Sequence, residues 1–339
     1  MSEPTDRATR RRIPGLAWAL LWLLGVEAAA RALWSPAWVG RLAELEPGFD
    51  LGFTFMRPQC EPDGPSRITC RPTQYRPIAR QSFARVKRPG TIRSFTFGGS
   101  HAAGASAYTS TLVRSLREDC GALRWEGINF AVKRHGSARI LVAAQEALAH
   151  APDLLILDFG GTNEFEDERD RDLRAQLHAG IWNYLFASHA VVLGRKLLTR
   201  RFPGLQPTLA SGDDEDVASR DPNNRARWQR SIADNYGAVI ALARARKIPV
   251  IVVGRASLQA HAPGSRELAN HRLFLSLAGD GVLLFDAHAA FDAVDDRRRR
   301  SLFSGDRQHY SAAGQRLIAE GLAALILREL PAARVCAAR

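Results

Sequence analysis

From residue 91 onward, short apolar runs alternate with longer segments whose apolar positions recur at helical spacing. Residues 91–97 alternate apolar and polar side chains, and residues 154–159 are apolar apart from Asp158, as in a strand buried on both faces. Further strands are expected at 123–130, 248–253 and 282–286, and helices at 138–150, 228–247 and 311–330. Strands that alternate with helices predict an α/β domain with a central parallel sheet covered on both faces.

An apolar run of a different kind lies near the N-terminus. It spans residues 13–26 and continues to residue 33 if Glu27 lies at a membrane interface, where it can pair with Arg31 on the same helical face. Roughly 20 residues suffice to cross a bilayer as a helix. Four arginines precede the run, and Trp34 and Trp38 follow it where an aromatic belt is expected.

These features predict a transmembrane signal-anchor, with residues 1–34 forming a cytoplasmic basic tail and the membrane helix. The rest of the chain is then extracytoplasmic, in a periplasm or at a cell surface. A secreted protein is the alternative, because Ala28-x-Ala30 resembles the cleavage site of a signal peptide.

Composition divides the exported part of the chain into regions. Residues 35–90 are rich in proline and arginine without a sustained period, and we expect a membrane-proximal segment packed on or leading into the main domain. The main domain spans residues 91–330, and residues 331–339 form a C-terminal tail. Charged and proline-containing stretches at 165–225 interrupt the alternation of strands and helices, which predicts an insertion over the top of the sheet.

The formal net charge of +12 comes almost wholly from arginine, since only four of the 47 basic residues are lysine. The arginines are scattered, and the run at 297–300 is expected to be a solvated loop. The sequence has no basic stripe with interleaved aromatic residues, so we expect no nucleic-acid partner. The charge still favours contact with anionic membranes or acidic polymers.

The four cysteines do not have the spacing of a metal site, and no metal is expected. Cys60 and Cys70 flank a turn-rich loop that can close as a disulfide in an oxidising compartment. Cys120 and Cys336 are expected to be unpaired thiols.

Residues suited to acyl transfer gather at one edge of the predicted sheet, where open α/β folds keep their active sites. Gly98-Gly99-Ser100 directly follows the first strand and places one hydroxyl at its carboxyl end. Asn163 follows the apolar strand at 154–159. Asp306 and His309 stand three residues apart at the entrance of the last helix.

Ser100, His309 and Asp306 fit the roles of a catalytic triad. The carboxylate can accept a hydrogen bond from one imidazole nitrogen while the other nitrogen faces the serine, which fixes the tautomer and stabilises the imidazolium. Each residue also has a purely structural interpretation: a glycine-rich turn around Ser100, a helix cap at Asp306 and a surface histidine at His309.

These motifs resemble those of the SGNH (GDSL-type) hydrolase family. Its blocks are matched by Gly98-Gly99-Ser100 (with glycine in place of aspartate), by Gly161-Thr162-Asn163-Glu164, and by Asp306 with His309 followed by Gly314. Gly136 is taken as the glycine of the family's second block. The resemblance covers roughly residues 91–330, and the N-terminal helix resembles that of membrane-anchored extracytoplasmic members.

The resemblance implies a flavodoxin-like three-layer α/β/α fold and a serine esterase that needs no cofactor. Ser100 would be the nucleophile, His309 the base and Asp306 the residue that orients the base. The oxyanion hole would be formed by the N–H groups of Ser100 and Gly136 and by the side-chain amide of Asn163.

An acyl ester is the implied substrate, with acetyl groups on carbohydrate expected from the family and the location. Two alternatives stay open: an O-acyltransferase with the same acyl-enzyme, and a non-catalytic glycan-binding module that keeps the fold. His101 and His135 also lie near this edge. They are expected to be substrate contacts or neutral surface residues, because neither has a carboxylate at a useful offset.

Overall fold

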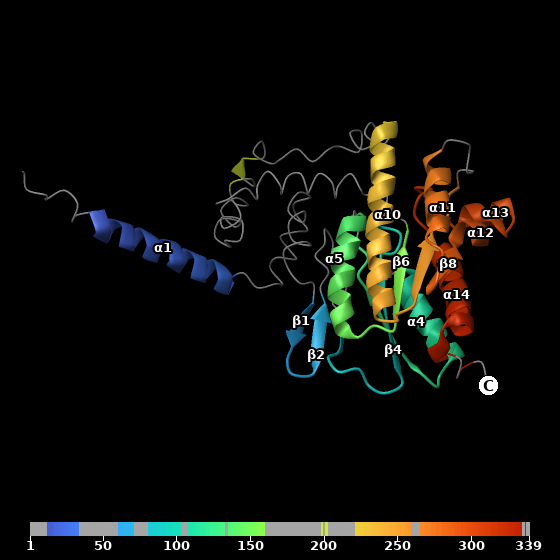
Figure 1. Cartoon of the computed structure of the whole chain (residues 1–339), viewed down its shortest axis with the longest axis horizontal. Helices are drawn as coiled ribbons and strands as arrows, with labels where there is room; N and C mark the ends of the chain where they lie inside the picture. Colours follow the sequence, from blue (N-terminus) through green and yellow to red (C-terminus); the bar gives the residue numbers. More distant parts are fainter. Residues whose placement is uncertain are drawn as a thin grey trace, which may run out of the picture.

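The computed structural model describes residues 12–33, 60–70, 81–103, 107–132, 135–159, 198, 201–202, 221–258, 265–333 and 336. Its main body consists of three layers, in which helices cover both faces of a parallel sheet (Figure 1). The α/β domain that the alternation of strands and helices predicts is therefore confirmed.

The central sheet contains β4 (Thr91–Phe97), β5 (Arg124–Asn129), β6 (Leu154–Asp158), β7 (Val250–Gly254) and β8 (Val282–Asp286). Among the described strands the order is β5-β4-β6-β7-β8, and every neighbouring pair is parallel. Numbered along the chain, this order is that of flavodoxin-like doubly wound folds. The topological switch point lies between β4 and β6, and such folds bind ligands there, at the carboxyl ends of the strands.

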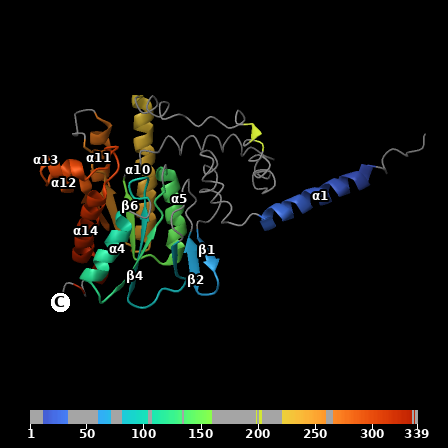
Figure 2. The same cartoon turned by 180° about the vertical axis from the view of Figure 1, so that it is seen from behind.

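Helices pack on both faces of this sheet (Figures 1 and 2). One face is covered by α4 (Tyr108–Asp119) and α14 (Ala312–Glu329), and the other by α5 (Ser137–Ala147), α10 (Pro222–Ala245) and α11 (Arg266–Ser276). The shorter elements are η2 (Leu148–His150), α12 (Ala287–Asp292), α13 (Asp296–Ser301) and η4 (Pro331–Ala333).

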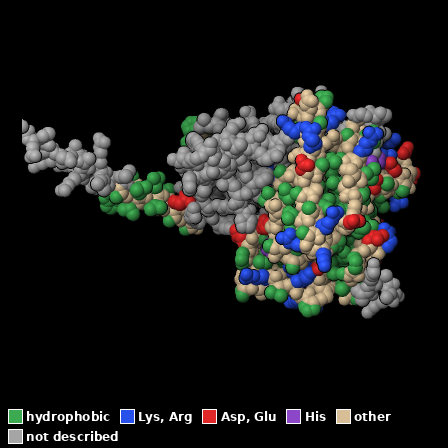
Figure 3. Space-filling view, in the orientation of Figure 1, with side chains coloured by type: hydrophobic (Ala, Val, Ile, Leu, Met, Phe, Trp, Pro, Cys, Tyr) green, Lys and Arg blue, Asp and Glu red, His purple; other side chains and the backbone are tan. Residues whose placement is uncertain are grey.

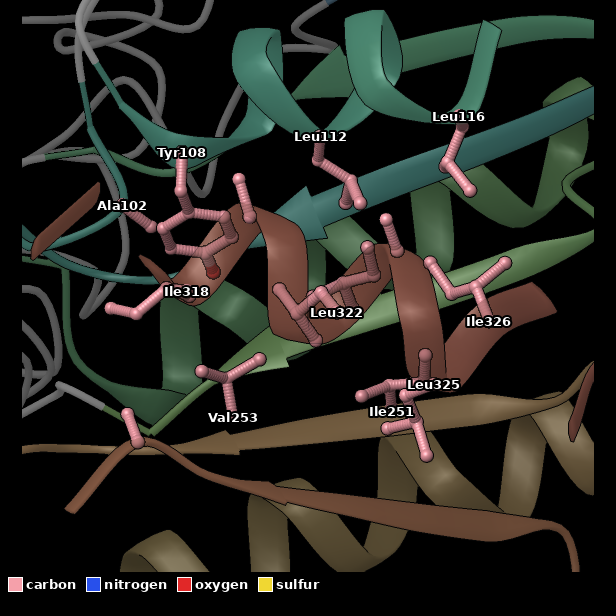
Figure 4. Packing of buried hydrophobic residues seen from close by; sticks show 14 of the residues in the cluster. Ala102, Tyr108, Leu112, Leu116, Ile251, Val253, Ile318, Leu322, Leu325 and Ile326 are labelled. Carbon is pink, nitrogen blue, oxygen red and sulfur yellow. The ribbon is translucent and has the colours of Figure 1, made fainter. Parts of the chain in front are cut away.

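Two apolar layers hold the helices to the sheet. Side chains alternate between the layers along each strand, so that Leu154 of β6 belongs to one and Leu155 to the other. Figure 4 shows the first layer, which includes Leu112 of α4, Leu322 of α14 and Ile251 of β7. Burial of both faces explains why β6 and β7 appear as apolar runs in the sequence.

A second, antiparallel sheet lies beside the main one. It is formed by β1 (Cys60–Asp63), β2 (Arg67–Cys70) and β3 (Gln81–Ala84), in that order among the described strands. It falls within the segment 35–90, whose sequence has no sustained period. Each strand has only four residues, which is too short for a clear periodic pattern.

Arg93 ties this small sheet to the main domain. Its fully buried side chain donates to Oε2 of Glu126 on β5 (2.8 Å), to the carbonyl of His150 (2.7 Å) and to the carbonyl of Ala84 on β3 (2.8 Å). The guanidinium carbon also lies 4.6 Å from the centroid of the Phe83 ring. These partners offset the desolvation of a buried charge, so the arginine can join the two sheets from the interior.

The N-terminal segment forms α1 (Arg12–Leu33), which lies apart from the α/β domain in Figures 1 and 2. In the part of the chain that the structure describes, no helix is both long and apolar enough to cross a membrane. The prediction of a transmembrane helix therefore has no support from the structure. Trp34, Trp38 and the side chain of Arg31 lie outside the described residues.

The run at 297–300 is helical, which corrects the expectation of a loop. It lies in α13, whose first turn is capped by Asp295 through a 2.9 Å bond from the N–H of Arg298. The arginines there are largely solvated, and in Figure 3 the Lys and Arg side chains are dispersed over the visible face among apolar and acidic ones. Most of the predicted insertion at 165–225 lies outside the described residues; α10 begins within it, at Pro222.

Two disulfides are present among the described residues, Cys60–Cys70 and Cys120–Cys336. The first links the paired ends of β1 and β2. The second corrects the expectation that Cys120 and Cys336 are unpaired. Cys120 ends α4 and Cys336 follows α14, and these two helices pack side by side, so the pairing depends on a tertiary contact that sequence spacing does not reveal.

Replacing both cysteines of one bridge by alanine is expected to lower the free energy of unfolding. The loss should be about 2–3 kcal/mol for Cys60 with Cys70 and about 5 kcal/mol for Cys120 with Cys336. The second loss is larger because the bridge spans a separation of 216 residues rather than 10, and loop-closure entropy grows with loop length. Denaturant unfolding of both double variants and the parent measures the two losses.

Non-reducing peptide mapping of the parent is the control for this comparison. It should recover both bridges in the pairing given above. Free thiols at these four positions, or a larger loss from the Cys60 and Cys70 pair, would contradict the assignment.

Candidate active site

The loop after β4 holds Ser100 at the carboxyl edge of the sheet, beside the switch point. A Cβ at Gly98 would lie 2.7 Å from the Cβ of Asp158 at the end of β6, closer than real Cβ atoms approach. Glycine therefore allows these two strand ends to lie together. The chain then turns, with the N–H of Ala102 donating to the carbonyl of Gly99 (3.3 Å), and leaves Ser100 partly exposed between buried neighbours.

Ser100, His309 and Asp306 form one continuous chain of hydrogen bonds. Nδ1 of His309 lies 2.6 Å from Oδ2 of Asp306, and Nε2 of His309 lies 2.8 Å from Oγ of Ser100. Because an ionised carboxylate only accepts hydrogen bonds, Nδ1 carries the proton and Nε2 can accept from the serine hydroxyl. The fold thus brings Ser100 to Asp306 and His309, which lie about two hundred positions later in the sequence.

Three donors converge on the other oxygen of Asp306. Oδ1 accepts from the hydroxyl of Ser304 (2.5 Å) and from the N–H groups of Gln308 and His309 (2.9 Å each). The bond from Ser304, followed by the backbone and ring bonds from His309 and the backbone bond from Gln308, holds the pKa of Asp306 well below its ordinary value. The side chain is half exposed, so little desolvation opposes these donors and the carboxylate stays ionised.

The backbone conformation of the turn at residues 304–309 lets these donors reach Asp306. Arg307 adopts a left-handed conformation with φ of 59°, and the next two N–H groups both reach the carboxylate of Asp306. The N–H of Ser304 closes the turn by donating to the carbonyl of His309 (2.7 Å). A non-glycine residue with positive φ is uncommon and is often found at functional sites.

Tyr310 and Gly314 anchor the turn to the domain. The hydroxyl of the buried Tyr310 accepts from the N–H of Ala256, just after β7 (2.9 Å). A Cβ at Gly314 would overlap the carbonyl of Leu302, so only glycine allows the start of α14 to pack against the segment before the turn.

Two residues that the sequence analysis did not identify hold the loops together. Asn129 at the end of β5 donates from Nδ2 to the carbonyl of Ala102 (2.7 Å) and accepts at Oδ1 from the N–H of Ala131 (2.9 Å). Gln315 on α14 accepts from the N–H of Tyr108 (2.8 Å) and donates to the carbonyl of His101 (3.1 Å). Neither residue belongs to a motif, and their roles depend on contacts between segments remote in sequence.

The predicted oxyanion donors are described only in part. Ser100 lies in the turn after β4, and Gly136 caps the N-terminus of α5 in an extended conformation. The loop that leads to Gly136 is bonded to the loop that holds Ser100 through the N–H of Val132 and the carbonyl of Gly98 (2.9 Å). Asn163 and its neighbours Gly161, Thr162 and Glu164 lie outside the described residues.

His101 and His135 are both buried, with 4% and 1% of their surface exposed, so the expectation of surface residues is wrong. Burial lowers the pKa of each side chain well below its ordinary value, with Arg255 and His309 contributing at His101 and Arg139 at His135. Both rings are therefore neutral at physiological pH, and both belong to the structure around the site rather than to its surface.

A possible metal-binding group among the described residues lies elsewhere. Ligand atoms of Cys60, Glu146 and His150 lie within 4.8 Å of one another, at the end of the domain where the strands begin. The sulfur of Cys60 is bonded to Cys70 and is not available as a thiolate. The group is therefore a poor metal site.

Replacing Ser304 by alanine is expected to raise the pKa of Asp306 toward its ordinary value, because the largest single contribution to its lowering is removed. A depressed pKa means that the charged carboxylate stabilises the fold above the ordinary pKa and that this contribution is lost as pH falls through the folded-state value. In Ser304→Ala the contribution should therefore be smaller, and its loss should be complete at a higher pH. Titration of the Asp306 carboxyl carbon by NMR measures the change.

Ser301→Ala is the matched control, because that hydroxyl donates to the carbonyl of Arg298 and not to Asp306. An unchanged Asp306 titration in Ser304→Ala, or an equal change in Ser301→Ala, would contradict the assigned cause.

No protein-family model matches the sequence, and no curated protein matches it either. Many solved structures resemble it at low identity, and three of them serve as examples. A lipase from a goat rumen metagenome is 15% identical over 69% of this chain and 96% of the lipase, with a TM-score of 0.43. A lipolytic G-D-S-L family protein from Veillonella parvula is 14% identical over 70% and 99%, with a TM-score of 0.42. A variant of an acetyl xylan esterase from Geobacillus stearothermophilus is 13% identical over 71% and 94%, with a TM-score of 0.45. At these values the likeness concerns the fold alone.

Proposed function

We propose that this chain is a serine esterase that cleaves acyl esters through an acyl-enzyme on Ser100. One observation carries the proposal: the 2.8 Å contact between Nε2 of His309 and Oγ of Ser100, at the end of a chain that begins at Asp306. A serine hydroxyl becomes a useful nucleophile when an adjacent base takes its proton. His309 is such a base, and its bond to Asp306 favours the tautomer that the reaction needs.

The reaction proposed has two half-reactions. Oγ of Ser100 attacks the ester carbonyl while Nε2 of His309 takes the hydroxyl proton, and the alcohol then leaves with that proton, so that Ser100 is acylated. In the second half, His309 takes a proton from water as the water oxygen attacks the acyl carbon, and it then gives that proton to Oγ of Ser100 as the acid leaves. Asp306 stays ionised and stabilises the imidazolium in both halves.

The negative oxygen of each tetrahedral intermediate needs hydrogen-bond donors. In this proposal they are the N–H groups of Ser100 and Gly136 and the side-chain amide of Asn163. The position of Gly136 at the start of α5 favours an anion, because helix N-termini carry unpaired N–H groups and a partial positive charge. Asn163 enters through its match to the family motif.

The proposed substrate is a short acyl ester, an acetyl group on carbohydrate, as the resemblance to SGNH hydrolases implies. An O-acyltransferase would use the same acyl-enzyme but resolve it with a sugar hydroxyl instead of water. A glycan-binding module would have no need of an activated serine.

The proposed location of the α/β domain is outside the cytoplasm, in an oxidising compartment. Two disulfides among the described residues support it, since such bonds are rare in reducing compartments. The peptide mapping described above tests this location when it is applied to protein from the native compartment, where free thiols would count against it.

Ser100→Ala and His309→Ala are each expected to lower kcat for a simple aryl acetate by roughly 10⁴ or more, because the nucleophile and the base act as one unit. Steady-state kinetics measures the loss. The parent should also be labelled on Ser100 by a fluorophosphonate probe, and Ser100→Ala should not. His150→Ala, a change at the far end of the domain, is the control and should turn over at the parent rate.

If the fluorophosphonate probe does not label Ser100 in the parent, the result would contradict the esterase and favour the glycan-binding module. The same assay with a polyol acceptor separates the two catalytic alternatives. Free acid is the expected product, and acylated polyol as the main product would indicate a transferase.

Asn163→Ala is expected to lower kcat by roughly 10²–10³ with little change in KM, because an oxyanion donor acts mainly in the transition state. If Asn163 only caps the following segment, its loss should cost about 1 kcal/mol of stability and leave kcat nearly unchanged. Thermal midpoints and kinetics on the same preparation distinguish these results. A variant that melts lower but turns over at the parent rate would remove Asn163 from the site.

A further inference from the structure

His101, the residue after the proposed nucleophile, has no role in the triad mechanism but contacts the base directly. Its side chain is 4% exposed, whereas Ser100 beside it is partly exposed. Its ring is stacked on that of His309, with centroids 5.1 Å apart and planes at 25°, and its centroid lies 5.3 Å from that of Tyr310. Burying a polar ring costs free energy unless the ring is hydrogen-bonded. The hydrogen bonds of the His101 ring therefore indicate its role.

Nε2 of His101 lies 3.1 Å from the carbonyl oxygen of Gln308. A carbonyl only accepts, so Nε2 carries the proton and the ring is a neutral donor. Among the described residues, Nδ1 of His101 has no partner. Burial, with Arg255 and His309, lowers the pKa of His101 and keeps the ring from becoming a cation beside the imidazolium that forms in the reaction.

The bond from His101 reaches the catalytic carboxylate through a single peptide group. The carbonyl of Gln308 and the N–H of His309 belong to the same peptide, and that N–H donates to Oδ1 of Asp306 at 2.9 Å. A donor on a peptide carbonyl polarises the peptide and strengthens its N–H as a donor. His101 therefore stacks on the imidazole ring of His309, and its hydrogen bond supports the peptide group that orients Asp306.

The main chain of His101 is fixed independently of its ring. Its carbonyl accepts from Nε2 of Gln315 on α14 at 3.1 Å. Side-chain substitutions at this position should therefore leave the backbone of the loop in place, which makes the role of the ring accessible to experiment.

We propose that His101 is a positioning residue for the base, which holds His309 and the 306–309 turn in the geometry that brings Nε2 of His309 to Ser100. It acts through stacking on the His309 ring and through its bond to the peptide between Gln308 and His309. The inference rests on the proposed esterase function, because it concerns the base of that reaction.

Three variants of His101 separate the two contacts. His101→Phe keeps a buried ring but removes the donor, His101→Gln keeps a donor at a similar reach but removes the ring, and His101→Ala removes both. For an aryl acetate we expect kcat to fall about tenfold in His101→Phe, because the carbonyl of Gln308 loses its donor. The fall should be larger in His101→Ala and partly reversed in His101→Gln, with KM changed less than about twofold.

The His309→Ala background and a control variant give the decisive readouts. With no base left to position, the His101 substitutions should cause no further loss of the residual rate. His150→Phe makes the same exchange at a histidine that is stacked on Phe95 (6.3 Å, 22°) at the other end of the domain, and it should keep the parent kcat.

Parent kcat in both His101→Phe and His101→Ala would overturn the proposal. An equal loss in the presence and absence of His309 would also overturn it, because that loss would reflect general destabilisation. Turnover by Ser100→Ala at the parent rate would instead overturn the esterase function itself, whatever the His101 variants do.

Discussion

The hydrogen bond between Ser100 and His309 joins two loops that are 209 residues apart in sequence, and the geometry of the candidate site depends on it. It can form only if α14 packs beside α4 on the same face of the sheet, because α14 begins just after His309 and α4 follows the Ser100 loop. Gln315 secures this arrangement by bonding to the backbone at both Tyr108 and His101.

Two close backbone approaches make that packing possible. Gly98 lets the ends of β4 and β6 lie together, and Gly314 lets the start of α14 lie against the carbonyl of Leu302. At each position a Cβ would have to displace a neighbour. In these two places glycine serves close packing rather than unusual backbone angles, since neither residue has a positive φ.

Charge in the site is controlled by local donors and by burial, in different ways at neighbouring residues. Asp306 is half exposed and is kept ionised by three donors on one oxygen. His101 is buried and is kept neutral by desolvation. In the proposed reaction, a proton can therefore pass between Ser100 and His309 while Asp306 and His101 keep their charge states.

The sequence by itself determined the alternation of strands and helices, the switch to glycine and serine after β4, and the spacing of Asp306 and His309. These features depend on local periodicity and on residues only a few positions apart. The tertiary structure alone decided the Cys120–Cys336 bridge, the burial of His101, the bonds of Asn129 and the interior position of Arg93. Each of these depends on which helix packs beside which strand and in what register. That choice minimises the free energy of the whole core, and no local pattern of residues encodes it.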